Sequence, residues 1–146
     1  MLAHLLFISS FFIKNQDNIY IQNIKGSAKG STNTENGTDF KFDQLNNKYI
    51  FIDTFTNKVL DNKHGLKPND LLFYTKHGNK NQLIDVVSDF DGNVKLMIDV
   101  LYIKYDSAKE SFVTVNSKEE SDNFVFVDSK SFKEYFIKPT QITKDS

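Results

Sequence analysis

The chain has 146 residues, a formal net charge of −1 and no cysteine, and all 18 of its basic residues are lysine. The absence of cysteine excludes disulfides, thiolate zinc sites and cysteine nucleophiles. A near-neutral chain without arginine argues against nucleic acid as a partner and against bidentate phosphate recognition. The length suits one β-rich domain over residues 1–146.

Residues 1–16 are expected to form a hydrophobic arm or a first strand. Residues 2–13 are apolar apart from His4, Ser9 and Ser10. This run is shorter than the roughly 20 apolar residues that a membrane-spanning helix needs. A cleavable signal peptide normally begins with a basic region, which is missing here, so a strand or an arm is favoured over a signal segment. An exposed apolar arm would favour a partner subunit.

Short strands and a polar loop follow. Alternating side chains predict strands at residues 18–24, 40–42 and 48–56. Between the first two of these, residues 25–39 have the sequence KGSAKGSTNTENGTD. Their glycine, serine, threonine and asparagine content predicts the longest and most mobile loop of the chain.

Residues 68–77 are the one segment for which the sequence predicts a helix. Pro68 suits a first helical position, Asp70 complements the helix dipole, and Gly78 suits the position after the last turn. The alternative is a strand at residues 71–75, as in small β-barrels with an LxPxD entry. The helix is the favoured interpretation.

The best-patterned β-structure is a hairpin over residues 83–105. Two apolar runs with a period of two flank an Asp-Gly-Asn turn at residues 91–93. The second run is apolar on both faces, because Met97, Leu101 and Ile103 lie opposite the side chains expected in the core. A cover on both faces, from the helix or a neighbouring subunit, would explain this pattern.

The rest of the chain predicts strands at residues 112–115 and 123–127. Residues 132–137 fit either a last strand or a helical turn, and residues 140–146 form a tail. With about eight strands and no internal repeat, the fold class is mainly β. We expect a single-domain antiparallel β-barrel or sandwich with one short α-helix.

No catalytic or metal-binding pattern stands out in the sequence. The acidic residues at 85–93 do not form a calcium loop, because valines occupy the positions of the required glycine and glutamate. His64 and His77 could meet across the predicted helix, but no histidine has zinc-site spacing. We therefore expect no enzyme activity, no catalytic residue, no cofactor and no metal. An enzyme would again be a candidate if the structure placed His64, His77 and an aspartate in one cleft.

The order of these features resembles the Hcp family, the tube proteins of bacterial type VI secretion. DNIYIQNIKGSAKGS at residues 17–31 is similar to the opening strand and polar loop of that family. FTNKVLDNKHGLKPNDLLFYTKHGNK at residues 55–80 resembles its strand and helix entry. The hairpin and residues 124–139 follow in the same order.

This resemblance implies a non-enzymatic structural subunit that assembles into rings stacked as a tube. It implies a homo-oligomer that contacts other secretion-system components or effectors, in the bacterial cytoplasm or secreted, with no nucleic acid and no membrane span. Two different complementary patches would form the ring contacts. The side chains expected there are apolar: Leu5, Phe7, Phe11, Phe12, Met97, Leu101 and Ile103.

The main alternative is a monomeric β-barrel binding module for a small ligand or peptide. It predicts a pocket that is lined by phenylalanine and tyrosine. The oligomeric state in solution would distinguish the ring-forming subunit from the monomeric binding module.

Overall fold

The computed structural model describes residues 9–63 and 67–135, and within them the chain is almost wholly β-structure. The described residues contain thirteen strands, paired antiparallel, and no α-helix. Three short 3-10 turns are present at Thr34–Asn36, Lys80–Gln82 and Lys118–Glu120. The mainly-β class is therefore confirmed, and the short α-helix is not found.

Twelve of the strands form three successive groups of four. The first group contains β1 (Phe11–Asn15), β2 (Tyr20–Ile24), β3 (Ser27–Ser31) and β4 (Phe40–Leu45). The second contains β5 (Lys48–Asp53), β6 (Val59–Asn62), β7 (Leu71–Tyr74) and β8 (Ile84–Ser88). The third contains β9 (Val94–Ile98), β10 (Leu101–Asp106), β11 (Ser111–Val115) and β12 (Phe124–Asp128). A short β13 (Glu134–Tyr135) pairs with β12.

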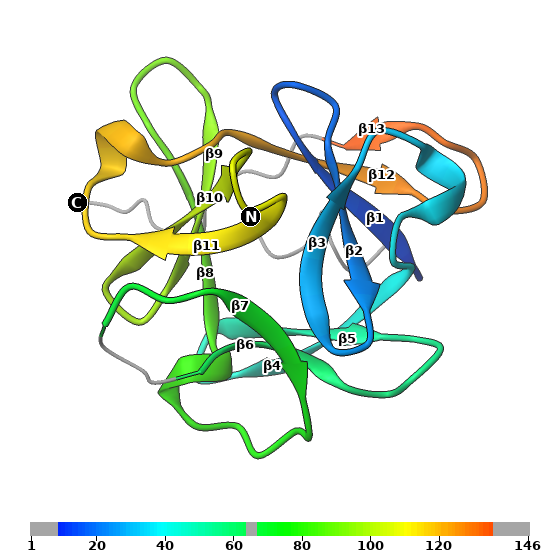
Figure 1. Ribbon diagram of the computed structural model, residues 1–146, viewed down its shortest axis with the longest axis horizontal. Helices are drawn as coiled ribbons and strands as arrows, with labels where there is room; N and C mark the ends of the chain where they lie inside the picture. The colour runs from blue at the N-terminus through cyan, green and yellow to red at the C-terminus, as the bar shows by residue number, and fades with distance from the viewer. Residues whose placement is uncertain (1–8, 64–66, 136–146) are drawn as a thin grey trace.

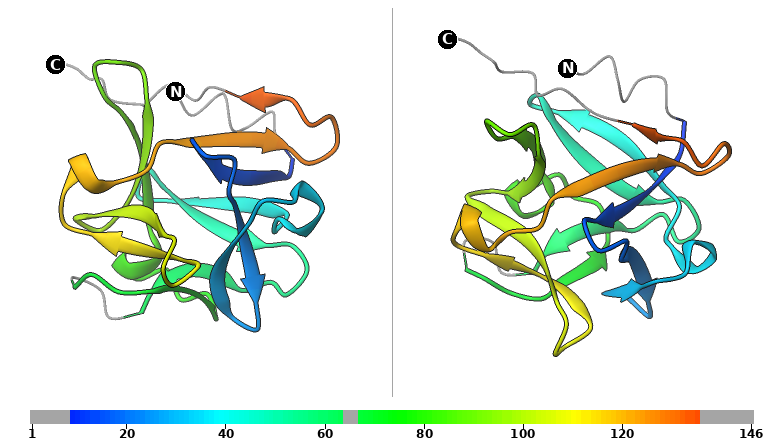
Figure 2. Two further views of the ribbon diagram at one scale, coloured as in Figure 1. Left: turned by 45° about the horizontal axis from the view of Figure 1, so that its top comes forward. Right: turned by 90° about the horizontal axis from the view of Figure 1, so that it is seen from above.

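The three groups repeat one pairing scheme. The two middle strands of each group form a hairpin, and the last strand of each group pairs with the first strand of the next group. The registers at these junctions are equivalent: Phe40 opposite Asp53, Ile84 opposite Ile98, and Phe124 opposite Asn15. Figure 1 looks onto the three hairpins, coloured blue, green and yellow. Figure 2 shows β12, from the third group, lying beside β1, the first strand of the chain, with which it pairs.

This arrangement is a β-trefoil with approximate threefold symmetry. This threefold repeat was not recognised in the sequence. The repeats share apolar character at equivalent positions rather than identical residues, so a scan for sequence identity does not detect them.

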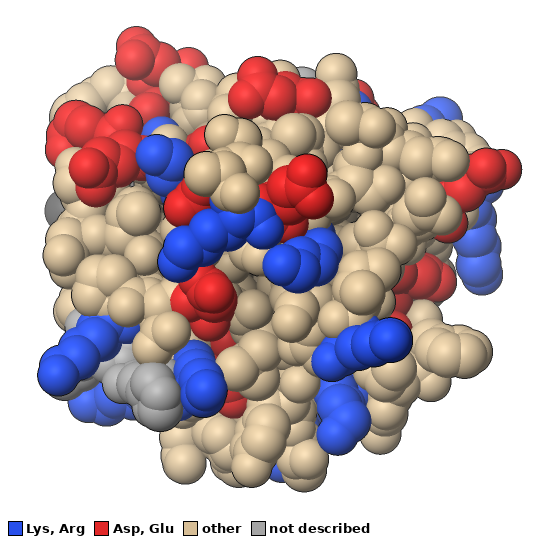
Figure 3. Space-filling view, in the orientation of Figure 1, with Lys and Arg blue, Asp and Glu red and all other residues tan. Residues whose placement is uncertain are grey.

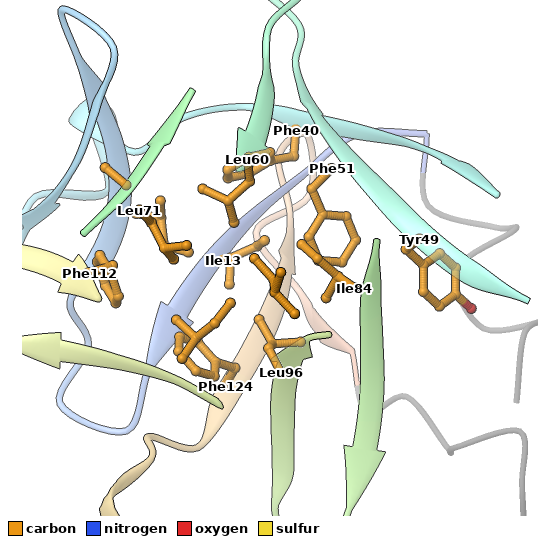
Figure 4. Packing of buried hydrophobic residues seen from close by; sticks show 14 of the residues in the cluster. Ile13, Phe40, Tyr49, Phe51, Leu60, Leu71, Ile84, Leu96, Phe112 and Phe124 are labelled. Carbon is orange, nitrogen blue, oxygen red and sulfur yellow. The ribbon is translucent and has the colours of Figure 1, made fainter. Parts of the chain in front are cut away.

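The core contains one apolar side chain from each repeat at successive levels (Figure 4). The pairing registers give three equivalent sets: Ile13, Phe51 and Leu96; Phe40, Ile84 and Phe124; Ala28, Leu71 and Phe112. Phe11 is fully buried beside the first set, with its ring 5.4 Å from Phe126 and 5.6 Å from Phe51. Full burial of one such side chain stabilises the fold by roughly 1.5–3 kcal/mol.

The segment predicted as a helix is a strand. In β7, Leu71 and Phe73 are buried while Tyr74 is exposed, which is the period of two of a strand. Backbone pairing with β6, a strand that the sequence analysis missed, outweighs the local helix signals at Pro68 and Gly78. The strand alternative at this position is therefore the correct one.

The polar segment at residues 25–39 contains a strand, so its prediction as one long loop is also wrong. Residues Ser27–Ser31 form β3 and pair with β2. A residue larger than glycine does not fit at Gly30. A Cβ added to Gly30 would lie 2.3 Å from Cε1 of Tyr105 and 2.7 Å from Cγ2 of Ile19. The glycine at this position therefore reflects close packing rather than a flexible loop.

Replacing Gly30 by alanine is expected to lower the free energy of unfolding by about 1–3 kcal/mol, because the Tyr105 ring must move within a packed environment. Urea denaturation measures this change. Ser27→Ala, on an exposed position of the same strand, is the control and should change stability by less than about 0.5 kcal/mol. Equal stability of the two variants would contradict this account of Gly30.

The long hairpin is interrupted by a turn that the sequence analysis read as strand. Asp99 has a positive φ of 56°, and the chain reverses between β9 and β10 at this point. The reversal changes which alternate residues face the core. Leu101 and Ile103 are therefore buried, whereas Val100 is 61% exposed. Leu101 and Ile103 are thus part of the core and need no subunit to cover them.

Candidate functional site

The residues predicted at subunit contacts differ in how far the structure buries them. Phe11, Leu101 and Ile103 lie in the core, and their burial is accounted for by contacts within the chain. Phe12 and Met97 are half-buried. Leu5 and Phe7 lie outside the described residues. Contact between subunits through these side chains, and assembly into a homo-oligomer, stays a prediction.

The acidic hairpin tip is a capped turn. Oδ1 of Asp89 accepts hydrogen bonds from the backbone N–H groups of Asp91 and Asn93, at 2.9 and 3.0 Å. Desolvation opposes ionisation of Asp89, but these bonds outweigh it and hold its pKa below the usual value. Among the described residues, no group of three His, Cys, Asp or Glu side chains is placed to hold a metal ion.

A hollow of about 320 Å³ lies on the second repeat, beside the hairpin of β6 and β7. Its lining combines one carboxylate, one aromatic ring, an imidazole and an amide with a lysine and a leucine: Asp61, Lys63, Leu72, Tyr74, His77 and Asn81. Asp61 comes from β6 and is only 2% exposed, whereas Tyr74 ends β7 and is 54% exposed. The hollow thus has a buried anionic floor and an accessible aromatic wall.

Buried Gln82 holds this hollow in shape. Its Oε1 accepts hydrogen bonds from the backbone N–H groups of His77 and Gly78, at 2.9 and 3.0 Å. Its Nε2 donates to Oδ2 of Asp61 at 2.8 Å and to the carbonyl oxygen of Thr75 at 2.9 Å. One side chain with no exposed surface therefore fixes both the carboxylate and the loop that carries His77.

The hydrogen bonds show which polar groups in the hollow can donate to a ligand and which can accept from it. Asn81 donates from Nδ2 to Oδ1 of Asp61 at 2.9 Å, so its own Oδ1 remains to accept. Nδ1 of His77 accepts from the N–H of Asn79, so in the neutral ring Nε2 carries the proton. That nitrogen lies 3.7 Å from Oδ2 of Asp61. The site presents two acceptors and a donor beside the face of Tyr74.

The threefold fold allows these positions to be compared between repeats. The strand registers place Gln22 and Lys104 at the position of Asp61, and Ser31 and Val115 at the position of Tyr74. The position of Asn81, just before that of Gln82, is occupied by Gly37 and Ser121. Only the second repeat combines a carboxylate, an aromatic ring and an amide.

Sequence reasoning singled out His77 but missed Asp61, Tyr74 and Asn81. No element was predicted at Asp61, and Tyr74 was placed in the predicted helix, so nothing indicated that they share a hollow. One weak signal was present in the sequence. A polar residue two positions before a large apolar residue recurs roughly every 40 residues, as Thr38 and Phe40, Gln82 and Ile84, Asp122 and Phe124.

The net charge of −1 gives the chain no strong overall charge. On the face shown in Figure 3, lysine and acidic side chains are interspersed. In the described part of the chain, no helix is long and apolar enough to cross a bilayer.

Comparison with protein-family models finds no match, and comparison with curated proteins also finds none. Solved structures do match. A GH43 β1,3-galactosidase superposes with a TM-score of 0.68 at 18% identity, over 85% of this chain and 28% of that one. An endo-β-galactosidase from Clostridium perfringens that releases GlcNAcα1-4Gal has a TM-score of 0.66 at 11% identity, over 83% and 32%. The chain thus spans less than a third of either glycosidase chain.

A third similar structure is SeviL bound to asialo-GM1 saccharide, with a TM-score of 0.66 at 14% identity over 84% of this chain and 98% of that one. The matched structures include no Hcp protein, so the resemblance to the tube proteins of type VI secretion is wrong. The motifs behind that resemblance describe strand order and turn residues, which many β-proteins share. At these identities the comparisons establish the fold, and the fold is the trefoil seen in the strand pairing.

Proposed function

We propose that this chain is a carbohydrate-binding module that holds a saccharide in the hollow formed by Asp61, Tyr74, His77 and Asn81. This proposal replaces the hypothesis that the chain is a subunit of a secretion tube. It is a specific form of the alternative hypothesis, a binding module for a small ligand or peptide. The observation that carries the proposal is the contrast between repeats. Asp61, Tyr74 and Asn81 occur together in one repeat, whereas neither of the other two repeats has a carboxylate or an aromatic ring at the equivalent positions.

The chemistry of the hollow suits a pyranose ring. Such a ring has hydroxyl groups that both donate and accept and one face made largely of C–H groups. The exposed ring of Tyr74 can pack against that face. Asp61 can accept from a hydroxyl while the Nε2–H of His77 donates to another. Because Gln82 fixes these groups in advance, little ordering is required on binding.

Binding without cleavage is the activity that the hollow supports. Glycoside hydrolysis ordinarily uses two carboxylates that flank the scissile bond. The described lining of the hollow contains one carboxylate, and it already accepts hydrogen bonds from Asn81 and Gln82. Galactose-containing saccharides are the first probes to choose, because two of the similar structures are named for galactosides.

Replacing Tyr74 by alanine is expected to weaken saccharide binding at least about ten-fold, or about 1.4 kcal/mol, because the stacking surface is lost. A saccharide array with the wild-type chain identifies the bound sugar, and calorimetric titration with that sugar gives the affinities. The side chain is half exposed and the backbone pairing is retained, so the variant should fold normally.

Val115→Ala is the matched control, because Val115 occupies the same position in the third repeat. This variant should bind as the wild type does. A wild-type chain that binds nothing on the array, or a Tyr74→Ala variant of unchanged affinity, would rule out the proposed site.

A further inference from the structure

A larger groove of about 770 Å³ lies elsewhere, at the junction of the first and second repeats. It is lined by the turn between β2 and β3, by residues 36–39, by the loop between β5 and β6, and by Phe73. Figure 1 shows two of these lining segments, the loop from β5 to β6 and the turn from β2 to β3, near one another. The Asp61 hollow shares none of these lining residues.

The groove has a preformed wall. Asp53, only 4% exposed, accepts hydrogen bonds from the N–H of Phe55 at 2.9 Å and from the hydroxyl of Thr56 at 3.0 Å. The amide of Asn23 donates to the same carboxylate at 2.8 Å. The buried carboxylate thus joins the loop of the second repeat to the hairpin of the first, and its bonding capacity is largely used within the fold.

The Asp61 hollow lies at the equivalent place in the second repeat, since Gln22 and Gly37 of the groove occupy the positions of Asp61 and Asn81. The loop that borders the groove differs from its counterparts at the other two junctions. Where the third repeat meets the first, Gln16 occupies the position of Thr54. Its side chain reaches across, donating to Asp122 at 3.1 Å and accepting from the N–H of Asn123 at 2.8 Å. Thr54 instead donates from its short hydroxyl to the carbonyl of Asp39, which leaves space.

Where the second repeat meets the third, the loop is reduced to a tight turn. β9 ends at Ile98 and β10 begins at Leu101, whereas the corresponding loop of the second repeat runs over residues 54–58. This longer loop places Phe55 at the edge of the groove with 94% of its surface exposed. Exposure of a whole phenylalanine ring contributes nothing to folding, so the groove combines extra loop length with an aromatic side chain free to contact a ligand.

We propose that this groove is a second saccharide-binding site, in which the C–H face of a pyranose ring packs on Phe55. A volume of this size is typical of small-molecule sites. Besides Phe55, the lining carries amides, a hydroxyl, a carboxylate and ammonium groups that can exchange hydrogen bonds with a ligand: Gln22, Asn36, Thr56, Asp39, Lys25 and Lys58. This combination suits a ligand rich in hydroxyl groups. The module would then hold glycans at two separate points and gain avidity on multivalent surfaces.

The test uses ¹⁵N-labelled full-length chain carrying Tyr74→Ala, which disables the Asp61 hollow. Methyl galactoside, methyl glucoside and methyl N-acetylglucosaminide are the neutral probes, titrated while amide chemical shifts are recorded. At least one of them is expected to shift the amides of Gly26, Gly37 and Phe55 in a saturable way. The shifts should disappear in Tyr74→Ala/Phe55→Ala. They should persist in Tyr74→Ala/Phe90→Ala, which removes another fully exposed phenylalanine.

The outcomes separate the two sites. If the wild-type chain binds saccharide only through the Asp61 hollow, with no shifts around Phe55, the second site is wrong and the proposed function stands. Shifts around Phe55 that survive its replacement also overturn the second site. If the Phe55-dependent shifts are present but the Asp61 hollow binds nothing, the second site stands and the first is wrong. Binding at neither place refutes both.

Discussion

Replacing Gln82 by leucine is expected to lower the free energy of unfolding by about 3–5 kcal/mol and to abolish saccharide binding in the Asp61 hollow. Leucine has a similar size, so the packing volume is kept while all four hydrogen bonds of the amide are lost. The buried carboxylate of Asp61 loses a donor, and two backbone N–H groups lose their acceptor. Each buried polar group left without a partner costs about 1–3 kcal/mol.

Urea or thermal unfolding followed by circular dichroism measures this loss. Lys80→Ala, two residues earlier and exposed, is the control and should change stability by less than about 0.5 kcal/mol. A leucine variant as stable as the wild type would show that Gln82 does not organise the loop. Retained saccharide affinity in that variant would show that the hollow does not depend on it.

Replacing Phe11 by alanine is expected to cost about 3–5 kcal/mol of unfolding free energy, the usual range for a buried phenylalanine. Phe11 has no exposed surface and contacts four aromatic rings: Phe40, Phe42, Phe51 and Phe126. These rings come from three different strands besides β1, so the cavity would open where the first, second and third repeats meet. Collapse around it is restricted because each neighbour is held by its own strand pairing.

Phe90→Ala is the matched control, since the same atoms are removed from a side chain that is fully exposed. Chemical denaturation of the two variants should give midpoints that differ clearly, with Phe90→Ala close to the wild type. Similar stability of the two variants would contradict the placement of Phe11 in the core.

The sequence by itself determined the class of the fold and many of its strands. Alternating apolar residues at 48–56 and a turn at residues 91–93 correctly predicted β5 and the hairpin of β8 and β9. These predictions succeeded because strand period and turn chemistry are local properties of the chain.

The tertiary structure decided what local patterns could not. Pro68 and Gly78 carry helix signals, yet pairing with β6 makes the intervening segment a strand. The glycine and serines of residues 27–31 look like a loop, yet they form β3 through backbone pairing with β2, and at Gly30 the approach of Tyr105 and Ile19 leaves no room for a Cβ. Asp99 turns the chain inside an apolar run, which reverses the predicted faces of Leu101 and Ile103.

The candidate site is likewise a product of pairing at a distance. Asp61 and Tyr74 become neighbours because β6 and β7 form a hairpin, and Gln82 then fixes Asp61 and the loop of His77. The combination of side chains in the hollow stands out only when the second repeat is compared with the other two. The equivalent positions in the three repeats are identified by strand register rather than by residue identity. The sequence specified that the chain would be β-structure, through side-chain alternation. The threefold closure, and with it the hollow, depended on which strands pair, because that is fixed by the shared core and not by any one segment.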